Sequence, residues 1–149
     1  MLYTIGTSNR SFEDFVRPLR SYGVTTAFDV RSRPYSRFRH FNRDRLEAAL
    51  ADRRIAYRWL GETLGGEATV HINSHEARRT LTELVDMCRT ANGVIFCAEH
   101  DPASCHRTWA IGKALLGQFD VSVLNILKND ELEPIDHTLQ RMGVRVNRA

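Results

Sequence analysis

Short apolar runs alternate along this chain with segments whose apolar residues recur at every third or fourth position, and this alternation constrains the fold more than any other feature. A short continuous apolar run indicates a buried strand, whereas the longer period indicates one face of a helix. The predicted strands are residues 2–7, 25–30, 55–59, 93–97 and 121–127. Strands that alternate with helices form βαβ units. We therefore expect a Rossmann-like three-layer α/β domain with a mostly parallel sheet of about five strands, flanked by helices.

The predicted helices carry apolar stripes and local capping signals. In the first of them Ser11 is the expected N-cap, and Pro18 is expected to kink the helix or end it early, because proline has no backbone N–H. The stripes are Phe12, Phe15, Val16 and Leu19; Leu46, Ala49 and Leu50; Leu81, Leu84, Val85 and Cys88; Ile111, Leu115 and Phe119; and Ile135, Leu139 and Met142. Residues 61–73 form the longest stretch without periodicity, and long loops in compact domains are often functional, so we interpret this stretch as a lid.

Length and composition narrow the class of protein. A chain of 149 residues that is 42% hydrophobic fits one domain, so we expect residues 1–149 to form a single domain. No apolar stretch approaches the roughly 20 residues of a membrane span, and residues 1–6 lack the length and charge of a signal peptide. Three cysteines argue against a disulfide scaffold and fit a reducing compartment. We expect a cytoplasmic protein with no membrane partner, in which Cys97 and Cys105 are free thiols or ligands.

Reactive side chains are concentrated in residues 97–107, which read Cys-Ala-Glu-His-Asp-Pro-Ala-Ser-Cys-His-Arg between a predicted strand and a predicted helix. In open α/β sheets, ligands bind beyond the carboxyl ends of the strands, where N–H groups of the next helix point into the crevice. If the first, second and fourth predicted strands are central neighbours, residues 7–10, 29–33 and 97–107 surround one crevice. We predict this crevice to be the active or binding site.

Four motifs occur in a characteristic order: Tyr3-Thr-Ile-Gly-Thr-Ser-Asn9, Asp29-Val-Arg-Ser-Arg-Pro34, Leu64-Gly-Gly66, and Cys97-Ala-Glu99 with Cys105-His-Arg107. Together they resemble the family of uncharacterised bacterial and archaeal proteins called DUF488, over nearly the whole chain. The resemblance implies the domain type and no particular chemistry, because the family name records an unknown function. The chain departs from the family pattern at Pro18, in a helix that is usually uninterrupted, and at Glu67, where a basic residue is common.

The first functional hypothesis is a hydrolase or transferase acting on a phosphate-bearing, nucleotide-like ligand. Arginine forks bind phosphate in a bidentate manner, and carboxyl groups at the mouth of a buried strand shift readily in pKa. The alternative is that Asp29 with Arg31, or Glu99 with Arg107, pairs only to hold the crevice together. The candidate catalytic residues are Glu99, Asp29, Cys97, Cys105 and His106, and the candidate ligand-binding residues are Ser8, Asn9, Arg10, Arg31, Ser32, Arg33 and Arg107.

The cysteines allow two further interpretations. A thiolate at Cys105 would have a lowered pKa near a helix start and arginines, yet no arginine stands six residues after Cys97 or Cys105, as rhodaneses and cysteine phosphatases require. A metal site would draw on Cys97, His100, Asp101, Cys105 and His106. Their spacing is not a zinc-finger spacing, and the adjacent Cys105 and His106 would converge poorly once the helix has begun. We therefore predict no metal, and the sequence requires no cofactor.

A non-catalytic nucleic-acid-binding module is the alternative function. The formal net charge is +3, and six arginines fall within residues 31–45, which contain one acid, Asp44. Arg37, Arg39 and Arg43 would neutralise phosphates, while Tyr35, Phe38 and Phe41 would stack on unpaired bases or, as we favour, fill the edge of the core. The chain has no glycine-rich dinucleotide fingerprint and no P-loop, so a dinucleotide dehydrogenase and a P-loop ATPase lack support.

Overall fold

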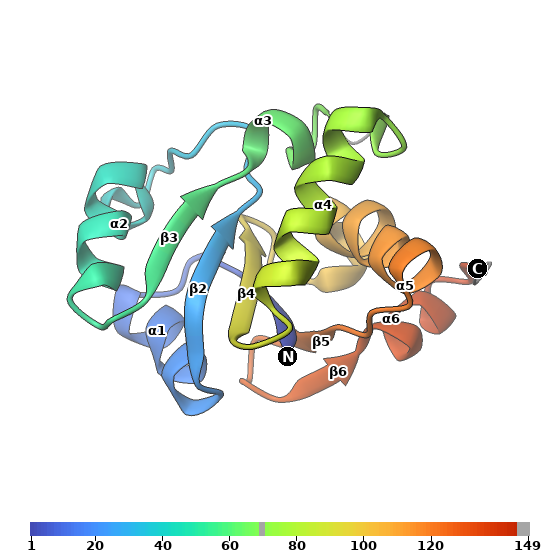
Figure 1. Cartoon of the computed structure of the whole chain (residues 1–149). Coiled ribbons are helices and arrows are strands. Elements are labelled where there is room, and N and C mark those ends of the chain that lie inside the picture. The colour runs from blue at the N-terminus through green and yellow to red at the C-terminus, as the bar shows by residue number, and fades with distance from the viewer. Residues whose placement is uncertain (69–70, 146–149) are drawn as a thin grey trace.

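A computed structural model describes residues 1–68 and 71–145 and contains one six-stranded sheet with helices on both faces (Figure 1). The strands are β1 (Leu2–Gly6), β2 (Val24–Asp29), β3 (Ala56–Trp59), β4 (Asn92–Cys97), β5 (Leu124–Ile126) and β6 (Leu132–Pro134). Their order is β3-β2-β4-β1-β5-β6, and every pair is parallel except β5 with β6. The α/β class with a mostly parallel sheet is thus confirmed, and β2, β4 and β1 are adjacent, as expected.

Two apolar clusters join the helices to the two faces of the sheet. The helices α1 (Phe12–Ser21) and α2 (Arg43–Ala51) cover one face, where Phe15, Leu46 and Phe96 belong to the same cluster. The other face carries α4 (His75–Met87), α5 (Lys113–Phe119) and α6 (Ile135–Arg141). The shorter helical segments are α3 (Gly61–Leu64), the 3₁₀ helices η1 (Arg39–Phe41) and η3 (Pro102–Ser104), and the π-helix η4 (Arg107–Gly112), which continues into α5.

The sheet has one strand more than predicted. The strand β6 pairs antiparallel with β5 through Leu124 and Pro134, and three residues that end in a proline show no alternating pattern by which to find them. The predicted strand over 121–127 is shorter, and the stretch 61–73 contains the helix α3. The lid interpretation falls partly on residues 69–70, which lie outside the described residues.

The helix α1 continues through Pro18 to Ser21, so the predicted early end does not occur. Proline cannot donate to the carbonyl of Asp14, four residues earlier. The side chain of Arg10 replaces that donor, because its Nη1 lies 3.2 Å from the Asp14 carbonyl oxygen. At the other end, the Ser11 hydroxyl accepts from the Asp14 N–H at 3.1 Å, which is the expected N-cap.

Gly6 lets the end of β1 lie directly against the loop that follows β4. A Cβ at this position would overlap the carbonyl oxygen of Glu99 and lie 2.6 Å from the Cα of His100. We expect Gly6→Ala to push residues 98–101 away from β1 and to lower the free energy of unfolding by about 1–3 kcal/mol, as overpacking does. Urea denaturation measures this cost. Gly66→Ala is the control, since a Cβ there makes only ordinary contacts, the nearest at 3.8 Å; equal costs for the two variants would contradict the argument.

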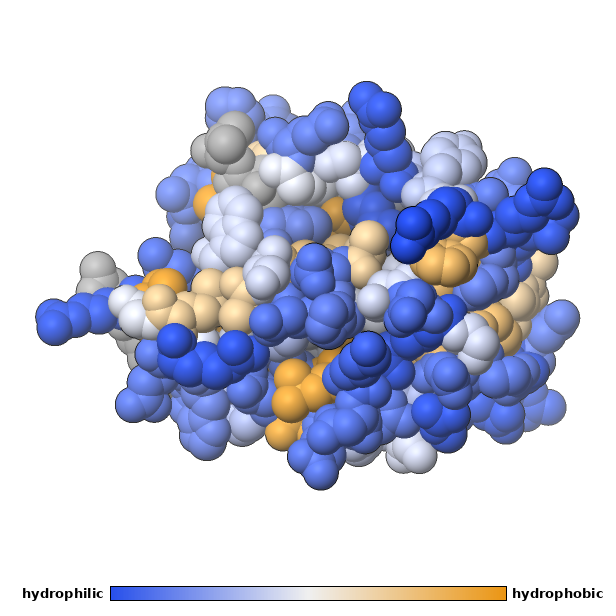
Figure 2. Space-filling model, turned by 180° about the vertical axis from the view of Figure 1, so that it is seen from behind, coloured by the Kyte–Doolittle hydropathy of each residue, from blue (hydrophilic) through white to orange (hydrophobic). Residues whose placement is uncertain are grey.

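The described helices include none with the length and apolar character that a bilayer span requires. The face of the molecule in Figure 2 is largely hydrophilic, and its apolar side chains form separate groups. This face therefore has no extended apolar patch of the kind that marks an interaction surface.

Candidate functional site

A cavity of about 430 Å³ lies beyond the carboxyl ends of β2 and β4. After β2 the chain leads to α2 on one face of the sheet, and after β4 it leads to η4 and α5 on the other (Figure 1). Because these connections leave adjacent strands in opposite directions, a crevice opens between them, which is where open α/β sheets bind ligands. The lining contains Arg31, Ser32, Cys97, Glu99, Cys105 and His106 from the predicted site, together with Gly66, Ala98, Ser104 and Trp109.

Cys97, Cys105 and His106 converge on one part of the cavity wall, with one ligand atom of each within 4.8 Å of the others. The two sulfur atoms are in contact as a disulfide, whereas the sequence predicted free thiols or ligands. The Cα atoms of Cys97 and Cys105 are 7.7 Å apart, which exceeds the roughly 4.4–6.8 Å usual for disulfides. This backbone separation favours the dithiol whenever the surroundings are reducing. The remaining cysteine, Cys88, is free.

His106 presents an unprotonated nitrogen to the sulfur atoms. Its Nε2 lies 3.0 Å from the carbonyl oxygen of Val30, which can only accept, so Nε2 carries the proton. Nδ1 is therefore the free nitrogen, and it lies 3.5 Å from the Cys105 Sγ. Burial lowers the pKa of His106 below its ordinary value, and the Arg107 charge acts in the same direction, while the backbone bonds to Val30 and Leu64 only partly offset this effect. The imidazole is thus neutral at pH 7, with its lone pair directed at Cys105.

Arg107 is fully buried beneath this cluster, outside the cavity lining in which the sequence predicted it. Its guanidinium donates to the carbonyl oxygens of Glu99 and His100, to the Thr4 hydroxyl and to the Cys97 Sγ, the last at 3.0 Å. Burial lowers the pKa of Arg107 to about 10.

No carboxylate of residues 1–68 or 71–145 forms an ion pair with Arg107. A buried charge is costly unless it is paired, and of the four groups that Arg107 contacts only the Cys97 sulfur can carry a full negative charge. The contact therefore places the positive charge of Arg107 directly against the Cys97 sulfur.

Asp29 and Arg31 form a buried bidentate pair at the base of the crevice. The distances are 2.9 Å from Nε to Oδ1 and 2.8 Å from Nη2 to Oδ2, and the hydroxyl of Tyr57 also donates to Oδ2. Burial and the bond to Asp29 raise the pKa of Tyr57, so its hydroxyl keeps its proton. Asp29 is fully buried, and both of its oxygens are occupied. This geometry favours the structural pairing that the sequence left open for Asp29.

The other predicted ligand-binding residues lie away from the cavity. Residues 8–10 are outside its lining, although the Ser8 N–H donates to the carbonyl of Ala98 at 2.7 Å and so holds the loop. Arg10 is buried and turns to Asp130, at 3.0 Å, and to the carbonyl of Leu127. Asn9 and Arg33 are exposed. The structure therefore brings residues 29–32 and 97–109 together and leaves residues 8–10 outside the cavity lining, beside the loop that follows β4.

Two of the three aromatic residues in the arginine-rich segment belong to the core. Phe41 is fully buried and Phe38 packs against the same cluster, whereas Tyr35 is 68% exposed. Two arginines predicted to bind nucleic acid cover aromatic rings: Arg37 lies 5.0 Å from the ring centre of Phe38, and Arg43 lies 5.3 Å from that of Trp59. The third, Arg39, is exposed. The aromatic side chains thus fill the edge of the core, as favoured above, except at Tyr35.

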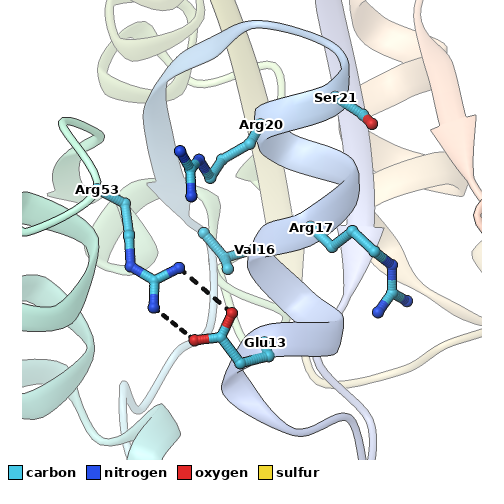
Figure 3. A pocket seen from close by; sticks show the side chains of 6 residues that line it. All are labelled: Glu13, Val16, Arg17, Arg20, Ser21 and Arg53. Atoms are coloured by element: carbon cyan, nitrogen blue, oxygen red, sulfur yellow. Dashed lines mark hydrogen bonds and ion pairs between the residues drawn. The ribbon is translucent and has the colours of Figure 1, made fainter.

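A second hollow lies beside α1 and is lined by Glu13, Val16, Arg17, Arg20, Ser21 and Arg53 (Figure 3). Arg53 reaches across it to Glu13, and Arg17 pairs with Asp14 and Asp130 outside it. Two of its three arginines are therefore paired. It lies along a helix, away from the carboxyl ends of the strands, so the cavity beyond β2 and β4 is the stronger candidate.

Trp109 is the main lining residue that the sequence analysis missed. It is 44% exposed and borders the cavity. The sequence does contain a signal for it. Trp109 falls outside the buried stripe of Ile111, Leu115 and Phe119, and side chains outside such a stripe face solvent.

Comparison with known families gives one result. Residues 11–71 match the model of DUF488, described as a domain of unknown function, and this range includes the motifs at 29–34 and 64–66. Neither the curated proteins nor the solved structures contain a match. The resemblance inferred from the motifs is thus confirmed for residues 11–71, which match the model of this family of unknown function.

Proposed function

We propose that the chain is an enzyme that hydrolyses, or transfers a group from, a nucleotide-like small molecule bound in the cavity beyond β2 and β4. The observation that carries the proposal is the convergence of Cys97, Cys105 and His106 on one wall of that cavity, with Glu99 also lining it. Two thiols and a neutral imidazole at one point are suited to hold or generate a nucleophile. In this proposal residues 1–149 form one Rossmann-like domain. Ligands of that architecture bind where the connections after adjacent strands lead to opposite faces of the sheet.

Trp109 supports a ligand with a planar ring. Its exposed indole borders the cavity, and stacking of a base on an aromatic side chain contributes about 1–3 kcal/mol. A phosphate on the same ligand would meet Arg31 and Ser32, which line the cavity, or the neighbouring Arg33. Arg31 donates three N–H groups to Asp29 and Phe41, and a guanidinium has five.

Glu99 is the group best placed to carry a proton. Its side chain is 45% exposed, and its Oε1 lies 3.3 Å from the Nδ1 of His100. We expect Glu99→Gln to lower kcat on the substrate by about 100-fold or more with little change in affinity, since general acid–base catalysis contributes roughly 10²–10⁴-fold. Steady-state kinetics measures both quantities. Full turnover by Glu99→Gln would remove this residue from the mechanism.

A thermal-shift screen of nucleotides, nucleosides, sugar phosphates and short oligonucleotides tests the proposal. A ligand at about 100 times its Kd stabilises the folded state by about 2.7 kcal/mol. We compare wild type with Trp109→Ala and use Tyr35→Ala as the matched control, because Tyr35 is an exposed aromatic residue outside the cavity lining. Arg31→Ala is unsuitable, since it would break the buried pair with Asp29.

The expected result is a small-molecule hit that weakens in Trp109→Ala and persists in Tyr35→Ala, followed by turnover of that compound. Hits restricted to oligonucleotides and lost in Tyr35→Ala would instead support the nucleic-acid-binding module. That module is less favoured here because Tyr35 is the one aromatic residue of the segment that is exposed.

A further inference from the structure

Three ligand atoms of the kind that zinc prefers meet at the cavity wall: the Cys97 Sγ, the Cys105 Sγ and the His106 Nδ1. We propose that, in the reduced protein, these atoms bind one zinc-type divalent cation whose fourth coordination position opens into the cavity. The binding of the metal rests on this geometry alone, and its use in catalysis rests on the proposed function.

One distance already suits a tetrahedral site, and the backbone allows the other once the disulfide is reduced. Bond lengths of about 2.3 Å from zinc to sulfur and about 2.0–2.1 Å from zinc to nitrogen place the two ligand atoms about 3.5 Å apart. The separation of the Cys105 Sγ and the His106 Nδ1 is 3.5 Å. Two zinc-bound sulfur atoms lie about 3.8 Å apart, and the 7.7 Å between the Cα atoms of Cys97 and Cys105 leaves room for that spacing.

The backbone removes the objection that adjacent residues cannot share an ion. Cys105 is extended, with φ −126° and ψ 143°, whereas His106 has helical angles of −59° and −21°. The helical segment therefore begins after Cys105. This change of conformation between the two residues directs the thiol and the imidazole to the same point.

Hydrogen bonds with residues that do not bind the metal hold two of the three ligand side chains in place. The Val30 carbonyl accepts the Nε2 proton of His106 at 3.0 Å and so leaves Nδ1 free to bind a metal. Arg107 donates to the Cys97 Sγ at 3.0 Å from its fully buried position. Metal-binding imidazoles are usually oriented by such a bond, and loss of an outer partner typically costs about 10–100-fold in metal affinity.

The fourth position faces the cavity, whose lining includes Gly66 and Glu99. Gly66 lies beside the His106 imidazole, since a Cβ there would lie 3.8 Å from Nδ1. Three protein ligands and an open position are typical of catalytic zinc. In hydrolysis, a metal-bound water gives a proton to Glu99, the hydroxide bonds to the electrophilic atom of the substrate, and the bond to the leaving group breaks as that group takes the proton from Glu99.

Cobalt titration of reduced, metal-free protein tests the site, because Co²⁺ bound to thiolates absorbs in the near ultraviolet. The variants are Cys105→Ser and His106→Gln, with Cys88→Ser as the matched control, since Cys88 is the free cysteine at the end of α4. Serine is well tolerated at a helix start, so Cys105→Ser is expected to fold. Zinc competition and the thermal shift caused by Zn²⁺ are recorded for each protein.

Wild type and Cys88→Ser are expected to bind one equivalent of Co²⁺ with the thiolate band, and Zn²⁺ should displace it. Cys105→Ser removes a direct metal ligand, so its affinity for Co²⁺ should fall by more than about 100-fold. That is the upper limit for the loss of a residue that only hydrogen-bonds to a ligand. Absence of the band in reduced wild type, or equal binding by Cys105→Ser, would overturn the proposal. Cobalt binding that depends on Cys105, without any small-molecule hit in the thermal-shift screen, would support the metal site and contradict the proposed enzyme. Small-molecule hits without cobalt binding would support the enzyme and contradict the metal site.

Discussion

Arg107→Met is expected to lower the free energy of unfolding by about 3–5 kcal/mol, the combined cost of leaving several acceptors without the donor that now serves them. Arg107 is fully buried and donates to the carbonyl oxygens of Glu99 and His100 and to the Thr4 hydroxyl. Methionine leaves these acceptors without this donor, and an unsatisfied buried acceptor, as the Thr4 hydroxyl would become, costs about 1–3 kcal/mol. The loop from Glu99 to Asp101 should loosen at the same time.

Urea denaturation measures the loss, and hydrogen exchange reports on the loop. Arg107→Lys is the matched variant, because lysine keeps the charge but lacks the planar fork that reaches several acceptors together. We expect Arg107→Lys to be intermediate in stability. A loss below about 1 kcal/mol for Arg107→Met, typical of a surface change, would mean that Arg107 does not hold the loop from Glu99 to Asp101.

Asp29→Asn is the second substitution with a large expected effect, again about 3–5 kcal/mol. The amide cannot neutralise Arg31, which is 6% exposed and has its bidentate partner in Asp29. The matched control is Asp86→Asn. Asp86 forms an exposed ion pair with Arg89, and such pairs contribute about 0–1 kcal/mol to the free energy of unfolding. Both costs are obtained from urea unfolding midpoints. Equal costs for Asp29→Asn and Asp86→Asn would show that the buried pair does not brace the crevice.

The architecture could be predicted because the strands and helices have clear periods. The apolar run at 93–97 and the stripe of Ile111, Leu115 and Phe119 specify β4 and the helix after it, and βαβ connection rules make the sheet mostly parallel. Two details depend on contacts distant in sequence or on very short elements. The helix α1 continues through Pro18 because Arg10 supplies the missing donor, and β6 is three residues long.

The position of the cavity could also be predicted, but which charged residues line it could not. The carboxyl ends of β2 and β4 meet at one cavity because the strands are neighbours. Whether an arginine faces a ligand or the interior depends on side-chain packing, and Arg10 and Arg107 both turn inward. The convergence of Cys105 and His106 depends on the backbone changing from extended to helical between them. The motif alone does not specify that change.

X-ray absorption at the zinc edge of the reduced, zinc-loaded protein tests most directly whether the sulfur–imidazole cluster is the chemical centre of the cavity. The account predicts two sulfur ligands at about 2.3 Å, one imidazole nitrogen at about 2.0–2.1 Å, and one further light atom from the open position. The same spectrum should lose one sulfur ligand in Cys105→Ser and stay unchanged in Cys88→Ser. A zinc environment made only of nitrogen and oxygen in the wild type would contradict the account.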